Sequence, residues 1–204
     1  LAHNPKSHLK SKTTAGRVNH HEASVEILVM GLGSEGIRYN RDPEITVANV
    51  HDKLQRAGHN IPKARIFNCV PRKGHNIDKK HFTNCTGRNY EIFQAVWQHR
   101  EGIRNTVNRL YDEYNKFNET RAHAGEEFHV VFYCESGMHE SRATAVGVKA
   151  WMKHIHKNIS VNVSYKHGEQ HGTRYCNPNR CPWCSIWKGR DNWELKLVEM
   201  ALIG

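Results

Sequence analysis

The chain of 204 residues lacks any run of about 18 apolar residues, so no membrane-spanning helix is expected. Acidic residues are also scarce, because 20 Asp and Glu stand against 30 Lys and Arg and leave a net charge of +10. This imbalance favours polyanionic partners, such as nucleic acid or phosphorylated metabolites. Five Trp, seven Tyr and six Phe argue against disorder, so we expect a folded globular protein with its own core.

The N-terminal segment has no acidic residue before Glu22 and no hydrophobic periodicity. It lacks the apolar core of a secretory signal, and the opening Leu1 in place of methionine indicates a processed chain. We interpret residues 1–22 as a basic flexible tail, with an organellar presequence as the alternative. An intracellular, cytoplasmic location is predicted, with organellar and nuclear locations left open and no membrane partner.

Apolar runs that end at Gly, Pro or polar residues predict four buried strands. They span residues 25–32, 64–70, 128–133 and 159–165. Helical stripes predict helices over residues 45–58, over 89–117 with a break near Gly102, over 145–155 and after Asp191. Tyr111 and Ile155 are assigned to the buried stripes. The order of elements predicts an α/β domain with a mostly parallel sheet, flanking helices and right-handed crossovers.

The chain is expected to divide into three parts: the tail, an α/β domain over residues 23–167, and a Cys- and His-rich extension over 168–204. Positive charge gathers in two stretches. Residues 63–88 hold seven cations against Asp78, and residues 142–190 hold nine against Glu169. Residues 72–88 also have little periodicity and are predicted to be a long functional loop. We expect two basic patches beside one anion-binding loop.

The third strand runs into a loop and a helix with the sequence CESGMHESR, from Cys134 to Arg142. A loop between a strand end and a helix start presents free N–H groups and the positive end of the helix dipole, which suits phosphate. The candidate ligand residues are Cys134, Ser136, Gly137, His139, Ser141 and Arg142.

A thiol at the start of such a loop also raises the cysteine phosphatase mechanism, which uses a Cys-x5-Arg loop. Here Glu140 occupies the arginine position and Arg142 arrives two residues later. Glu135 and Glu140 add negative charge beside the thiol, which opposes a low pKa. A phosphate-ester or nucleotide-processing enzyme with Cys134 or His139 as the reactive group remains the alternative function.

The run FHVVFYCESGMHESRATAVGVKAWM resembles the C-terminal domain of the RapZ family, in which a strand ends in a Cys-Thr-Gly-Gly-x-His-Arg-Ser loop before a helix. Cys134, Gly137, His139 and Ser141 match that motif. Phe67-Asn68, the Gly74-His75-Asn76 region and Thr86-Gly87-Arg88 are similar to the family's upstream motifs. The resemblance covers residues 25–167.

This resemblance implies a sensing domain that binds an amino-sugar phosphate at the loop, binds small RNA through basic surface, and works as an RNase adaptor. It adds Asn68 to the ligand residues, and we expect the basic loop to close over the phosphate through Arg72, Lys79, Lys80 and Arg88. Glu135, Ser136 and Glu140 depart from the family motif. The family's N-terminal kinase-like domain has no counterpart, because the sequence contains no Gly-x4-Gly-Lys-Ser/Thr motif.

Three cysteines fall within nine residues, in the pattern Cys176-x4-Cys181-x2-Cys184. Three thiolates and one imidazole suit a closed tetrahedral Zn²⁺ site, with His171 or His167 as the fourth ligand. An iron–sulfur cluster is the alternative, with a ligand from Cys69 or Cys85. Because cations surround this predicted zinc knuckle, we expect it to contact nucleic acid.

Together these features predict a non-catalytic regulatory domain that recognises a sugar phosphate, a nucleotide or RNA. A protein adaptor that uses the terminal helix is a third class, with only generic support.

Overall fold

The computed structural model describes residues 23–31, 43–69, 89–98, 100–120, 126–134, 137, 139–165 and 193–203. The strands in these ranges are β1 (Val25–Gly31), β2 (Arg65–Asn68), β3 (Phe128–Cys134) and β4 (Val161–Tyr165). The helices are α2 (Pro43–Arg56), α4 (Tyr90–Gln98), α5 (Arg100–Glu119), α6 (Glu140–Ile155) and α9 (Trp193–Ile203).

The four described strands form one parallel sheet in the order β2-β3-β1-β4. The predicted α/β fold with flanking helices is therefore confirmed, and every described strand pair is parallel. Each strand falls within a run of residues that the hydrophobic pattern identified, apart from Cys134 at the end of β3. No described helix is both long enough and apolar enough to cross a bilayer.

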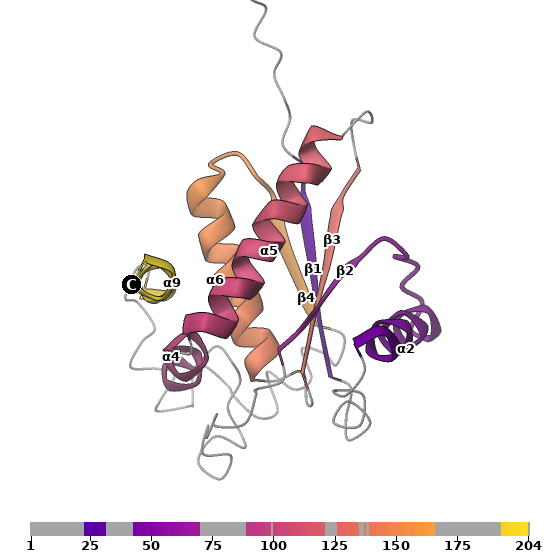
Figure 1. Ribbon diagram of the computed structural model, residues 1–204, viewed down its shortest axis with the longest axis horizontal. Coiled ribbons are helices and arrows are strands. Elements are labelled where there is room, and N and C mark those ends of the chain that lie inside the picture. Colours follow the sequence, from indigo (N-terminus) through magenta and orange to yellow (C-terminus); the bar gives the residue numbers. More distant parts are fainter. Residues whose placement is uncertain are drawn as a thin grey trace, which may run out of the picture.

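Helices cover both faces of the sheet. Successive side chains of a strand point to opposite faces, so the apolar strands have a hydrophobic surface to bury on each side. Leu28, Met30 and Val131 pack on one face with Val50 and Leu54 of α2. The opposite face carries the larger core, to which α4, α5, α6 and α9 contribute, and we call it the helical face. Figure 1 shows α2 alone on one side of the sheet and the other four helices on the opposite side.

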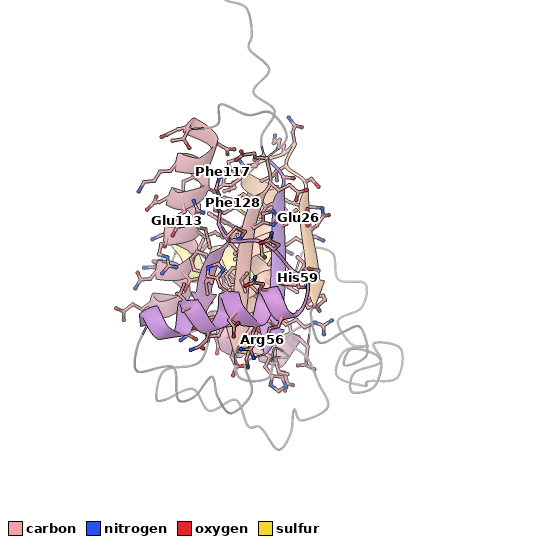
Figure 2. All side chains as sticks on the ribbon, turned by 90° about the vertical axis from the view of Figure 1, so that its right-hand side faces the viewer. Glu26, Arg56, His59, Glu113, Phe117 and Phe128 are labelled. Carbon is pink, nitrogen blue, oxygen red and sulfur yellow. The ribbon has the colours of Figure 1, made fainter. Side chains whose placement is uncertain are left out.

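The face under α2 is only partly apolar. Figure 2 looks onto it, with α2 crossing in front of the sheet and Glu26 above the helix. Glu26 is half-buried, and its Oε1 accepts a hydrogen bond from Asn162 Nδ2 on β4 at 2.6 Å. A polar contact between β1 and β4 therefore replaces apolar packing on this part of the face.

On the helical face, α4 and α6 approach closely at a glycine. The Trp97 side chain of α4 is buried, and its Nε1 donates to the Ala143 carbonyl of α6 at 3.1 Å. A Cβ placed on Gly147 would lie only 2.1 Å from the Trp97 ring. The indole therefore occupies the space that a side chain at position 147 would need.

The sequence predicted a break near Gly102; α4 ends at Gln98 and α5 begins at Arg100, so Gly102 itself lies in the first turn of α5. Two other sequence-based expectations for these helices are wrong. Tyr111 is 37% exposed and packs edge-on against Trp151 instead of entering the core. Ile155 is 39% exposed, because it ends α6.

The outer edge of β2 is covered by an arginine from α5. Arg109 donates from Nη2 to the outward-facing Ile66 carbonyl at 2.9 Å, and its guanidinium carbon lies 4.3 Å from the centre of the Phe67 ring. Glu113 forms ion pairs with both Arg109 and Arg65. These contacts fix α5 against the edge strand.

Candidate functional site

The predicted loop lies at the point in the parallel sheet where the strand order reverses, between β1 and β3. The chain passes from β1 to α2 on one face, and from β3 to α6 on the other, although β1 and β3 are neighbours. Loops at the carboxyl ends of such neighbouring strands diverge and leave a crevice, which is the usual ligand site of open parallel sheets. In Figure 1 these strand ends point downward, toward the first turn of α6.

A row of three residues ends the sheet on the helical face. Gly31 of β1 stands opposite Cys134 of β3. Cys69 follows β2, and its backbone N–H donates to the Tyr133 carbonyl at 2.7 Å, which places Cys69 opposite Cys134 on the other side. Two thiols and one glycine therefore lie side by side at the carboxyl edge.

The buried Cys134 thiol holds the loop to the start of α6. Its Sγ accepts a hydrogen bond from the Gly137 N–H at 3.1 Å and lies 3.1 Å from the Ser141 hydroxyl. The backbone N–H of Ser141 is also close enough to lower the pKa of this thiol. Three of the predicted ligand residues, Cys134, Gly137 and Ser141, are thus brought together around one sulfur atom.

Both thiols at this edge are held in the protonated form. Burial raises the pKa of Cys134, the Glu140 carboxylate raises it further, and the hydrogen bonds from Ser141 and Gly137 only partly oppose this. Burial also raises the pKa of Cys69, and the nearby Thr144 hydroxyl only partly opposes this. Neither thiol is an activated nucleophile at neutral pH.

Gly137 is the point of closest approach between the loop and the sheet. Its φ is +72°, and a Cβ there would lie 2.6 Å from the Gly31 nitrogen and 2.8 Å from the Met30 carbonyl carbon. An L-residue fits neither the backbone conformation nor the space. The loop therefore lies directly on the end of β1.

The other described candidates lie around this centre. His139 is half-buried at the N-cap position of α6 and makes no capping hydrogen bond through its side chain. Arg142 is buried, with its guanidinium carbon 4.0 Å from the centre of the Tyr165 ring at the end of β4. Asn68 is exposed and stands opposite Tyr133, so it belongs to the α2 face of the sheet, not to the helical face.

The remaining predicted residues lie outside the described part of the chain. These are the loop residue Ser136, the cations Arg72, Lys79, Lys80 and Arg88, and the zinc ligands His171 or His167, Cys176, Cys181 and Cys184. Within the described ranges, no three His, Cys, Asp or Glu side chains are placed to hold a metal ion.

From the sequence, Cys69 was named only as a ligand for the alternative iron–sulfur cluster, and Gly31 and Thr144 were not singled out. Thr144 lies one helical turn after Glu140, and its Oγ1 donates to the Glu140 carbonyl at 2.8 Å. One signal could have found Cys69: it directly follows a predicted parallel strand, and the carboxyl ends of such strands share one edge of the sheet.

Comparison with known proteins adds no relative: no family model matches the chain, and no curated protein or solved structure is significantly similar to it. The resemblance to the RapZ C-terminal domain therefore stays a prediction that rests on the motifs quoted above.

Proposed function

We propose that the protein is a non-catalytic binding domain that recognises a phosphorylated ligand, either a sugar phosphate or a nucleotide, or RNA, at the loop between β3 and α6. The observation that carries this proposal is the position of the loop at the reversal point of the sheet, with Gly137 seated on Gly31 and the start of α6 beside it. A crevice with a helix N-terminus is suited to phosphate.

Each described residue has its own part in this proposal. Cys134 and Ser141 position the loop, because their polar atoms already bond to each other and to the loop backbone. His139 lies at the helix start, where its imidazole adds a hydrogen-bond donor beside the positive end of the helix dipole. Arg142 supplies positive charge at the end of β4.

The other part of the proposed site is the basic segment after β2, whose role is inferred from the sequence. Arg72, Lys79, Lys80 and Arg88 follow β2, whose end borders β3 at the same edge of the sheet. In the proposed complex these cations close over the phosphate, and the positively charged tail and extension add RNA affinity.

A binding role is favoured over thiolate catalysis. Burial and the Glu140 carboxylate raise the pKa of Cys134, whereas a catalytic cysteine needs a lowered pKa. The sulfur is also engaged by Gly137 and Ser141, so it faces the loop backbone instead of a substrate.

The proposal includes a structural Zn²⁺ in the extension, held by Cys176, Cys181, Cys184 and either His171 or His167. Metal analysis is expected to find one zinc per chain, which Cys181→Ser loses and Cys69→Ser keeps.

The test measures binding of inorganic phosphate and a sugar phosphate by calorimetry, and binding of RNA across a salt series. We expect His139→Ala to weaken phosphate binding about tenfold, since one charged hydrogen bond contributes roughly 1.5 kcal/mol. The matched control is His154→Ala on the same helix, which removes only an exposed pair with Glu199. RNA affinity is expected to fall steeply with salt.

Equal phosphate affinity in both histidine variants would contradict the proposed site. A flat dependence of RNA affinity on salt would remove the polyanion part. Turnover of a phosphomonoester, abolished by Cys134→Ser, would establish the enzyme alternative instead.

A further inference from the structure

The two thiols at the end of the sheet form a pair that the binding role does not use. We propose that Cys69 and Cys134 are joined in a disulfide when the protein meets hydrogen peroxide or a small-molecule disulfide, and that this bond ties the carboxyl ends of β2 and β3 together beneath the first turn of α6.

The first support is the register of the sheet. The Cys69 N–H bonds to the Tyr133 carbonyl, so Cys69 continues the β2–β3 ladder and stands opposite Cys134. Neighbouring strands lie about 4.8 Å apart. Disulfides join Cα atoms that are roughly 4.4–6.8 Å apart, so the spacing permits the bond.

The second support is that both side chains lie on the same face. Phe67 and Phe132 precede the two cysteines by two residues on their strands, and their ring centres are 5.5 Å apart on the helical face. Because side chains alternate along a strand, Cys69 and Cys134 share that face. Both are free thiols in this structure.

The third support is the shared environment under α6. Ser141 and Thr144 are three residues apart on this helix; the Ser141 hydroxyl lies 3.1 Å from the Cys134 sulfur, and the Thr144 hydroxyl is near enough to Cys69 to lower the pKa of that thiol. The thiols are close enough that charge on Cys134 raises the pKa of Cys69. The pair is therefore a single cluster and not two separate buried cysteines.

The proposed oxidation proceeds in two steps. Because burial raises the pKa of Cys69, the first step is slow at neutral pH and faster in alkaline solution: Cys69, which is half-buried, loses its proton and its sulfur attacks one oxygen of hydrogen peroxide, which yields a sulfenic acid and releases water. Cys134 then attacks that sulfenic sulfur, its proton leaves with the displaced hydroxyl as water, and the S–S bond forms. With a small-molecule disulfide as oxidant, Cys69 forms a mixed disulfide and Cys134 displaces the second small thiol.

This bond would change the loop as well as the sheet. Once bonded to Cys69, the Cys134 sulfur has no proton to donate to Ser141 and is drawn toward β2, away from the Gly137 N–H. The N–H that now holds the sulfur becomes available to another acceptor. The expectation that oxidation alters phosphate binding rests on the proposed function, whereas the disulfide itself does not.

The test treats the whole protein with hydrogen peroxide, blocks the remaining thiols, and maps unreduced peptides by mass spectrometry. We expect a peptide that links residue 69 to residue 134, formed in the wild-type protein and lost on treatment with dithiothreitol. Cys69→Ser should abolish the linked peptide. The matched control Cys85→Ser, which removes a different cysteine of the sequence, should keep it.

A second measurement needs no variant to fold. Phenylarsine oxide binds pairs of neighbouring thiols, so it should protect Cys69 and Cys134 of the wild-type protein together from alkylation. Linkage of Cys69 to another cysteine, or independent oxidation and alkylation of the two thiols, would overturn the proposal. If the linked peptide forms but neither redox state binds phosphate, the proposed function fails while the disulfide stands.

Discussion

Two glycines from different strand ends decide how the loop before α6 meets the sheet. Gly137 has a positive φ and faces the Met30–Gly31 backbone at a separation that leaves no room for a Cβ. Gly31 stands beside Cys134 in the β1–β3 register, so the sulfur-centred hydrogen bonds and the glycine contact lie next to each other. The position of the predicted binding loop therefore depends on the absence of a Cβ atom at residue 137.

Substitution Gly137→Ala is expected to lower the free energy of unfolding by about 2–5 kcal/mol. Roughly 1–2 kcal/mol comes from the left-handed backbone, and about 1–3 kcal/mol from overpacking against Gly31. The control is Gly58→Ala, because Gly58 has a φ of +80° with no described atom within 4 Å of a built Cβ. Urea denaturation of both variants measures the difference, and equal losses would show that the contact with Gly31 is unimportant.

At the scale of elements, the contact between α4 and α6 depends on Gly147, whose missing side chain leaves room for the Trp97 indole. Trp97 fills the space above Gly147 and donates to the Ala143 carbonyl one turn earlier in α6. Asn89 caps the start of α4 through its Oδ1, which accepts from the Glu91 N–H at 2.9 Å. The helix that follows the predicted basic loop is thus fixed at both its first turn and its buried face.

Substitution Gly147→Ala is expected to destabilise the protein, although alanine is the better helix former. Propensity gains up to about 1 kcal/mol, but displacement of the Trp97 ring costs roughly 1–3 kcal/mol or more. The paired control is Gly102→Ala in α5, where no described atom lies within 4 Å of the built Cβ, so a gain of up to about 1 kcal/mol is expected. Thermal denaturation followed by circular dichroism should show opposite signs, and a gain in both variants would contradict the packing argument.

Sequence patterns predicted the strands well because each is a short apolar run closed by a polar residue or a turn. The stripe argument failed at Tyr111, because a residue at the margin of a helical stripe can cover a neighbouring helix instead of entering the core. The boundary between α4 and α5 lies close to Gly102, as the sequence predicted, and Gly102 itself is tolerated in the first turn of α5.

The candidate site was predictable only where it is local in the chain. Cys134, Gly137 and Ser141 lie within eight residues, so one motif found them all. Cys69 and Gly31 come from other strands, and their approach to Cys134 depends on the strand order, which no local pattern contains. Asn68 was placed with the loop, but residue alternation puts it on the face under α2.

At the scale of the whole molecule, pH acts on folding through every group whose pKa differs between the folded and unfolded chain. The two edge thiols have raised pKa values in the folded protein because they are buried. An unfolded chain loses these protons above about pH 8.5, whereas the folded chain keeps them. Their stabilising contribution is therefore fully present below that pH and is lost as the pH rises further.

We expect the free energy of unfolding to fall between about pH 8.5 and 10.5, by up to roughly 1.4 kcal/mol per pH unit for each thiol. Cys134→Ala should have a shallower slope over that range than the wild-type protein, whatever its stability at neutral pH. Guanidinium denaturation at a series of pH values provides the measurement. Identical slopes would mean that the Cys134 thiol ionises as readily in the folded chain as in the unfolded one.

The arginine on the outer edge of β2 has a consequence for how molecules meet each other. An incoming strand from a second molecule would need the Ile66 carbonyl as an acceptor, but Arg109 already occupies it and is itself held by Glu113 and the Phe67 ring. Such a strand would have to expel a guanidinium before its first bond could form. Arg109 therefore protects this edge against intermolecular sheet growth, and so against aggregation when the protein is crowded.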